Sequence, residues 1–400
     1  MITIHPFQAW RPRSHSAVEI ACVPYDVIDS HEARQLSEGN ERSFLHVIRP
    51  EIDLPEDTGL YDDIVYETGA ANLHRMQQRG WLVQDATPQL YLYRQQMGSH
   101  EQTGLFSCVS VNDYDNNRIL KHELTRPDKE DDRTRHILNQ RAHAEPVMLT
   151  FRQDDGFEAL VGKECSRLPI YDFTASDGVS HKMWQVSDPD AFVELFTRVD
   201  RLSIADGHHR CKSASRVAEQ LRTPGSSGDE EFEFFPAVLF PMNQMQILPY
   251  NRTIKQVPES FMQQLGEMFE YRLDTSAVPE VPGRVSLYYK GVWVGIDLPD
   301  GTTEQAVDAL DVSRLQQYIL KPLLGIHDAR TDKNIDFVGG IRGIAELEKR
   351  VDSRQAELAI SMYPTQIDQL VSVADEDCLM PPKSTWFEPK LRSGLLIHAF

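Results

Sequence analysis

A polar turn stands between a predicted strand and a predicted helix within residues 201–221. Leu202 and Ile204 alternate with polar neighbours, which is typical of a half-buried strand, and apolar residues then recur at helical spacing up to Leu221. The free N–H groups at the start of a helix bind anions. The turn therefore predicts an anion site, and it consists of Asp206, Gly207, His208, His209 and Arg210.

Each residue type in this turn fits such a site. Gly207 lets the backbone wrap closely around a ligand, Arg210 offers a two-pronged guanidinium for phosphate or carboxylate, and the two histidines add donors or bases. The alternative is an ordinary helix start, in which Asp206 caps the helix while His208, His209 and Arg210 face solvent. A zinc site is disfavoured, because Asp206, His208 and His209 are too close in sequence to bind one ion easily.

A second group of charged residues spans Lys121–Arg133. Glu123 follows a predicted strand, and a carboxylate at a strand end suits a general base or a Mg²⁺ ligand. Arg133 closes the run and could neutralise charge that develops during a reaction. We expect this run to be too charged for a core, so that it lies on a surface or lines a solvated cleft. A solvated loop without a chemical role is the alternative.

A third group lies in Pro381–Arg392. Lys383, Ser384 and Thr385 are similar to the end of a P-loop, but the preceding pattern of glycines is missing, so a P-loop is excluded. Lys383 and Lys390 could still reach an anionic ligand from a loop.

Composition limits the classes of function. The chain has 400 residues and a formal net charge of −20, which disfavours a sequence-independent binder of nucleic acid. The five cysteines are scattered without close pairs, so we expect free thiols in a reducing cytoplasm. No apolar run is long enough to cross a bilayer. We therefore expect a cytoplasmic protein whose partner is a small-molecule substrate, with no nucleic acid and no membrane; a homo-oligomer is left open.

The pattern of elements predicts a mixed α/β (α+β) protein with two domains. The predicted domains are 1–256, which contains the polar turn, and 257–400, an α/β domain. Asp188 and Pro189 predict a helix start, with a capping carboxylate followed by proline at the first helical position. Phe44–Ile48 is an apolar run that we interpret as a buried strand.

Several motifs together resemble one family. They are spread from Pro24 to Gly394 and are specific as a set: PYDVID, KHELT with KEDDR, HKMW, IADGHHRCKSA, LPYNR and MPPKSTWFEPKLRSG. This set resembles the prokaryotic domain-of-unknown-function 1015 family. One residue departs from the family pattern, since Asn251 stands where we expect histidine. If that histidine is catalytic, the family activity does not carry over to this chain.

The DGHHR turn also resembles, more distantly, the phosphate-binding turn of the ParB/sulfiredoxin-like fold. That resemblance implies a ParB/sulfiredoxin-like nucleotide-binding core. Members of that superfamily include CTP-using partition proteins, sulfiredoxin and kinases that act on free serine.

The expected function is a nucleotide-dependent phosphotransferase, a kinase that acts on a small hydroxy-amino acid such as free serine with ATP or ADP and Mg²⁺. Glu123, Asp206 and His208 would be catalytic, with Asp206 also placing the metal. The nucleotide would be bound by Gly207, His209, Arg210, Arg133 and Lys383. Phosphoryl transfer suits this set because it needs mostly positioning and positive charge.

Two other functions are weighed against this one. A ParB-like regulatory or DNA-partition protein would bind a nucleotide without turnover of a small substrate, and it would need a basic helix-turn-helix, which the acidic balance disfavours. A sulfiredoxin-like reductase would need a reactive cysteine beside the turn. Cys211 is the candidate, but helical spacing places it on the buried face.

Overall fold

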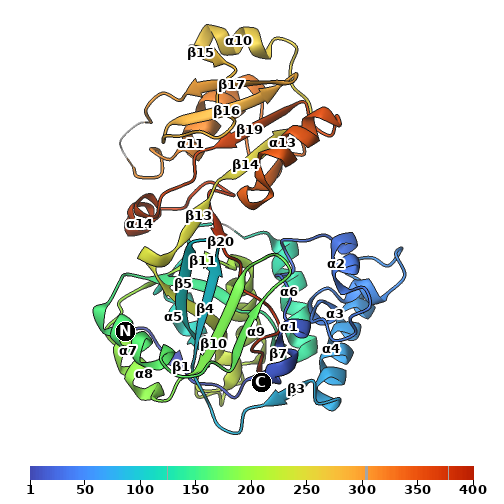
Figure 1. Ribbon diagram of the computed structural model, residues 1–400, viewed down its shortest axis with the longest axis vertical. Helices are drawn as coiled ribbons and strands as arrows, with labels where there is room; N and C mark the ends of the chain where they lie inside the picture. The colour runs from blue at the N-terminus through green and yellow to red at the C-terminus, as the bar shows by residue number, and fades with distance from the viewer. Residues whose placement is uncertain (124, 302–304, 377) are drawn as a thin grey trace. The chain divides into compact units, whose positions relative to one another are not determined.

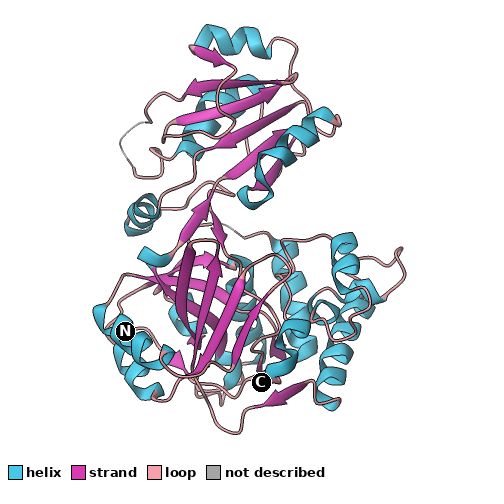
Figure 2. Ribbon diagram, viewed as in Figure 1, coloured by secondary structure: helices cyan, strands magenta, loops and turns pink. Residues whose placement is uncertain are grey.

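The computed structural model describes residues 1–123, 125–301, 305–376 and 378–400, and it has the mixed α/β class that the sequence predicts (Figures 1 and 2). Its contacts divide the chain into two compact units. The first unit contains 1–121, 125–245 and 389–400, and the second contains 246–388 together with His122 and Glu123. The chain thus returns to the first unit after the second. The domain boundary expected after residue 256 stays a prediction.

A mixed sheet forms the centre of the first unit. Within the described residues it has nine strands, in the order β6-β11-β8-β12-β5-β4-β10-β9, and β1 pairs with β5. β11 runs parallel to β6 and antiparallel to β8, while β12 runs parallel to β8. The strand bounds are β1 (Ile4–His5), β4 (Tyr91–Met97), β5 (His100–Ser110), β6 (Ile119–Leu120), β8 (Val147–Phe151), β9 (Tyr171–Thr174), β10 (Ser180–Gln185), β11 (Leu202–Asp206) and β12 (Phe234–Pro241).

The main core of the first unit lies between this sheet and the helices α7 (Asp155–Cys165), α8 (Pro189–Phe196) and α9 (His208–Leu221). Phe157 is fully buried there and packs edge-on against Phe151, with ring centroids 5.1 Å apart. The predicted start of α8 is confirmed, because the Asp188 side chain accepts the Ala191 N–H and proline follows it.

A second core in the first unit joins α3 (Leu45–Ile48) and α4 (Asp63–Gln78), and α4 in turn packs beside α6 (Pro127–Gln140) (Figure 1). The strand predicted over Phe44–Ile48 is wrong, since this run is helix α3. A short unbroken apolar run shows no period, so either element can bury it. The smaller elements of this unit are α1 (Ala17–Ile20), α2 (Ser30–Ser37), α5 (Val111–Asp115), β2 (Trp10–Pro12), β3 (Leu82–Gln84), β7 (Ala142–His143) and β21 (His398–Ala399).

The second unit is built on an antiparallel sheet. In the part that the structure describes, its order is β15-β17-β16-β19-β14-β18, and β13 pairs separately with β20. The strands are β13 (Gln246–Leu248), β14 (Tyr250–Ile254), β15 (Tyr271–Leu273), β16 (Arg284–Tyr289), β17 (Val292–Asp297), β18 (Ile335–Gly339), β19 (Leu358–Met362) and β20 (Trp386–Glu388). The helices are α10 (Phe261–Met268), α11 (Asp311–Leu315), α12 (Lys321–Leu324), α13 (Gly343–Asp352) and α14 (Ile367–Asp375).

Across the described residues of both units, every helix is too short or too polar to span a lipid bilayer.

The aromatic core gives a first prediction. Phe157→Ala should lower the free energy of unfolding of the first unit by about 3–5 kcal/mol, because it removes a ring that packs against Phe151, Phe192 and Phe196. Urea unfolding followed by fluorescence measures the change. Leu168→Ala is the matched control, since Leu168 is 94% exposed, and it should change stability by less than about 0.5 kcal/mol. Equal losses in the two variants would contradict this placement of the core.

Candidate functional site

The polar turn has the local structure that its sequence predicts. β11 ends at Asp206, Gly207 takes the left-handed conformation with φ 104°, and α9 begins at His208. A Cβ atom at Gly207 would lie only 3.0 Å from Arg210 Nε and from Val147 Cγ1. Both the backbone conformation and this crowding explain why glycine occupies the turn.

Asp206 lies between two cations. Lys390 Nζ donates to Asp206 Oδ1 at 2.7 Å, and Arg210 Nη2 donates to Asp206 Oδ2. Arg210 is 7% exposed and also donates through Nη1 to the carbonyl oxygen of Pro146. Burial alone would raise the pKa of Asp206, but the charges of Lys390 and Arg210 outweigh it and hold that pKa well below its usual range. Asp206 is therefore a charged anchor at neutral pH.

The turn joins the starts of two helices. The ring nitrogen Nε2 of His209 accepts the backbone N–H of Arg126 at 3.0 Å, directly before α6 begins. Ser213 Oγ donates to the Glu130 carbonyl oxygen at 3.1 Å, which ties the next turns of α9 and α6 together. The positive ends of two helix dipoles thus lie side by side at this turn. His208, a buried residue, is the first residue of α9 and lies at this turn.

Arg133 is a buried residue of helix α6. Its Nε and Nη2 donate to Asp132 Oδ2 at 3.0 and 2.7 Å, and its guanidinium stacks 4.0 Å from the ring centroid of Tyr25. The third nitrogen, Nη1, lies 3.6 Å from Glu145 Oε2. The expectation that the charged run is too charged for a core and lies on a surface or lines a solvated cleft is wrong for Asp132 and Arg133, which are buried in helix α6. Their charges are matched by each other and by Glu145, which lies outside the run.

The C-terminal segment 389–400 supplies further contacts in this unit. Lys390 reaches Asp206, Arg392 Nε donates to His181 Nε2 at 3.2 Å, and Ser393 Oγ donates to Glu145 Oε1 at 3.2 Å. Arg392 also binds the Asp177 carboxylate. Residues of five separate motifs, PYDVID, KEDDR, HKMW, DGHHR and KLRSG, therefore make contacts within one unit.

Comparison with protein families places the chain. Residues 4–313 match the family described as "Protein of unknown function (DUF1015)". The chain belongs to the DUF1015 family. No curated protein matches the sequence of this DUF1015 protein.

Solved structures similar to the DUF1015 protein share little sequence with it. SbnI with a C-terminal truncation, from Staphylococcus aureus, is 11% identical with a TM-score of 0.39, covering 73% of this chain and 87% of that one. A free serine kinase in complex with AMP is 10% identical with a TM-score of 0.39, covering 72% and 92%. A conserved hypothetical protein from Pyrococcus furiosus is 12% identical with a TM-score of 0.36, covering 72% and 95%.

Three singled-out residues belong to the second unit of the DUF1015 protein: Glu123, Lys383 and Asn251. Lys383 Nζ lies 5.5 Å from the ring centroid of Tyr250, and the Lys383 carbonyl oxygen accepts from Arg252 Nη2 at 3.1 Å. The Asn251 side chain is buried and accepts the Met362 N–H at 3.0 Å. The roles expected for Glu123 and Lys383 stay predictions.

Cys211 lies where the helical spacing predicts, fully buried in α9. Burial raises the pKa of its thiol to about 12, so it is protonated at neutral pH and a poor nucleophile. This argues against a sulfiredoxin-like reductase. All five cysteines are free thiols, as the sequence predicts.

Sequence reasoning missed Glu145, a carboxylate whose side chain is only 7% exposed. Burial raises the pKa of Glu145, although Arg210 and Arg133 act in the opposite direction. Nothing in its local sequence, AEPV, signals a site. Lys390 had a signal, since it lies in a basic loop, but its partner Asp206 is 184 positions away.

The ion pairs of Asp206 with Lys390 and Arg210 yield a second prediction. Lys390→Met should lower the free energy of unfolding at pH 7 by about 2 kcal/mol, because a charge-assisted hydrogen bond to a largely buried carboxylate is lost. Lys182→Met is the control, since Lys182 and Asp172 form a pair that is 40% and 50% exposed; it should cost less than about 0.5 kcal/mol. Denaturation of both variants beside the wild type gives the comparison.

The same variant has a defined pH dependence. The pKa of Asp206 is lower in the folded protein than in the unfolded chain, where it is about 4. Ionised Asp206 therefore stabilises the fold fully above about pH 4, and this stabilisation is lost as the pH falls through the pKa of the folded protein. The difference between wild type and Lys390→Met should therefore be constant from pH 7 to about 5 and shrink below about 4. A difference that grows on acidification would refute the ion pair.

Proposed function

We propose that this DUF1015 protein is a nucleotide-dependent phosphotransferase that acts on a small hydroxy-amino acid such as free serine. The observation that carries the proposal is the pair of helix starts at Gly207, where His209 joins the N-terminus of α9 to that of α6. The positive ends of two helix dipoles favour a phosphate at this place.

Phosphoryl transfer asks the protein mainly to position the reactants and to stabilise negative charge. In the proposed site the N–H groups after Gly207 bind phosphate oxygens, and Arg210 supplies positive charge fixed by Asp206. His209 acts as a positioning residue, because its ring holds the start of α6. His209, Arg133 and Lys383 remain the proposed further contacts to the nucleotide. His208 remains a proposed catalytic residue and Glu123 the proposed base.

ATP or ADP would supply the phosphoryl group, and Mg²⁺ would offset the negative charge of its phosphates. Mg²⁺ is usually held by phosphates, waters and one or two carboxylates. Each carboxylate oxygen of Asp206 already accepts a hydrogen bond from a cation. Asp206 is therefore better placed to orient Lys390 and Arg210 than to bind a metal ion directly. Among the described residues, no group of three or more His, Cys, Asp or Glu side chains could hold a metal ion. The metal role of Asp206 stays a prediction.

A third prediction tests the proposed reaction. The wild type, incubated with ATP or ADP, Mg²⁺ and a panel of hydroxy-amino acids, should form a new phosphomonoester that phosphorus NMR detects. Arg210→Lys should lower kcat/KM about 100-fold, because an ammonium cannot replace the two-pronged contact of the guanidinium with Pro146 and Asp206. Arg216→Ala is the control on the same helix: its partners are Glu130 and Asp131, and it should keep activity.

Thermal unfolding with each nucleotide separates the alternatives. Absence of product, together with nucleotide stabilisation that Arg210→Lys abolishes, would refute the kinase and support a nucleotide-binding regulator. Absence of stabilisation by every nucleotide would refute both functions.

A further inference from the structure

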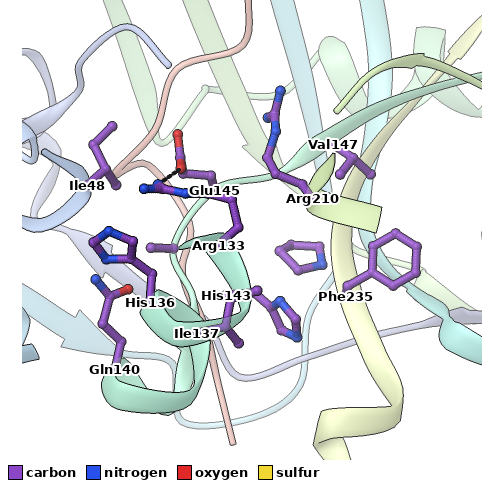
Figure 3. A pocket seen from close by; sticks show the side chains of 12 residues that line it. Ile48, Arg133, His136, Ile137, Gln140, His143, Glu145, Val147, Arg210 and Phe235 are labelled. Carbon is purple, nitrogen blue, oxygen red and sulfur yellow. Dashed lines mark ion pairs between the residues drawn. The ribbon is translucent and has the colours of Figure 1, made fainter. Parts of the chain in front are cut away.

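The first unit contains a small cavity, which is lined in part by Arg133, Glu145 and Arg210 (Figure 3). Its volume is about 30 Å³. One buried water needs roughly 10–15 Å³ of such space, so the cavity has room for about two or three waters and none for a substrate. The charged groups of its wall already face each other, since Arg133 Nη1 lies 3.6 Å from Glu145 Oε2 (Figure 3). A ligand site has better support in the second unit.

The second unit contains a buried arginine, Arg252, that has no carboxylate partner. The buried arginines in the described part of the chain are Arg133, Arg210, Arg252, Arg314 and Arg392. Four of them pair with an aspartate: Arg133 with Asp132, Arg210 with Asp206, Arg314 with Asp311 and Arg392 with Asp177. Arg252 is 3% exposed and forms no ion pair with any residue that the structure describes. Buried charges are normally paired, so Arg252 is the exception that needs a cause.

Apolar neighbours surround Arg252. It lies in β14, between β18 and β19, and its cross-strand neighbours are Phe337 and Ile360. Its guanidinium carbon lies 5.6 Å from the ring centroid of Phe337. Burial lowers the pKa of Arg252 to about 10. The side chain is still charged at neutral pH, so β14 holds a buried positive charge that no described carboxylate balances.

The guanidinium of Arg252 has N–H groups to spare. Nη1 donates to the Tyr250 carbonyl oxygen, and Nη2 donates to the Lys383 carbonyl oxygen at 3.1 Å. A guanidinium has five N–H groups, so about three remain without an acceptor among the described residues. The two carbonyl oxygens orient the guanidinium but bring no net charge. A carboxylate or a phosphate matches the guanidinium fork in both shape and charge.

The residues around Arg252 form a layer that reaches the surface. Tyr250, Phe337, Lys383 and Trp386 are each partly exposed. The ring of Tyr250 packs edge-on against Phe337 and Trp386, with centroids 5.8 and 5.1 Å apart. Lys383 Nζ lies 5.5 Å from the ring centroid of Tyr250 and brings a second positive charge to this layer. Positive charge at the surface above a buried guanidinium favours the approach of an anion.

We propose that Arg252 anchors an anion site in the second unit, which binds the carboxylate or phosphate group of a small ligand. The oxyanion accepts hydrogen bonds from the guanidinium N–H groups that the carbonyl oxygens of Tyr250 and Lys383 leave unused. Its negative charge balances the buried charge of Arg252, which is costly while it has no counter-ion. The site uses residues of the second unit alone and does not rest on the proposed phosphotransferase function.

A fourth prediction uses NMR of the full chain with isotope-labelled arginine, at an ionic strength held constant with sodium chloride. Loss of a side-chain Nε–H signal in Arg252→Met identifies the signal of Arg252. Inorganic phosphate or acetate should shift this signal in the wild type and saturate it with a Kd of about 1 mM, the affinity that a few charge-assisted hydrogen bonds supply. The anion with the lower Kd shows whether the site prefers a phosphate or a carboxylate.

Substitutions locate the anion. Calorimetric titration with the tighter of the two anions is done in the Arg210→Lys background, so that the proposed phosphate site at Gly207 does not contribute. Adding Arg252→Lys should weaken binding about tenfold, because an ammonium cannot replace the two-pronged contact of a guanidinium. Arg330→Met is the control in the same unit and should leave binding unchanged, since Arg330 is 42% exposed and pairs with Asp328.

Two results would overturn the site. The first is a wild-type Arg252 signal that does not move, or moves without saturation, up to about 50 mM of both anions. The second is equal binding with and without Arg252→Lys, with circular dichroism showing that both proteins fold. If Arg252→Lys does not fold, the wild-type signal alone decides. Neither result depends on the formation of a phosphomonoester, so this proposal and the phosphotransferase fail separately.

Discussion

The ion pairs of Asp206 with Lys390 and Arg210 are the interaction on which the candidate site depends. Taking a carboxylate out of water costs several kcal/mol unless cations and hydrogen bonds replace its hydration. Here one cation comes from α9 and the other from segment 389–400. The end of β11, the start of α9 and this segment must therefore take their places together.

Arg210 connects this ion cluster to the cavity. Its guanidinium is fixed by Asp206 and Pro146, and its side chain also contributes to the lining that contains Arg133 and Glu145. The ion cluster and the cavity thus share one buried side chain.

Local features of the sequence predicted local structure well. The change from a period of two to helical spacing, with Gly207 between, located the strand, the turn and α9. Asp188 with Pro189 located the start of α8 for the same kind of reason. The apolar run Phe44–Ile48 was wrongly predicted, because its partners in the second core decide between strand and helix and lie elsewhere in the chain.

Contacts between distant residues could not be predicted. Charge density suggested a solvated place for Asp132 and Arg133, whereas the Tyr25 ring and Glu145 allow both to be buried. The pairing of Lys390 with Asp206 spans 184 positions and has no local signature. His136 and His143 stand in ordinary helical and strand sequence, and only the folded chain brings the two residues to the lining of one cavity.

The return of segment 389–400 to the first unit has a consequence for biosynthesis. Ribosomes make proteins from the N-terminus, and domains generally fold in that order. In this chain the partner of Asp206 is synthesised only after residues 246–388 have been made. While residues 246–388 are translated, the Asp206 carboxylate in the nascent first unit lacks one of its two cations. The Asp206 cluster is therefore completed only after residues 246–388 have been made.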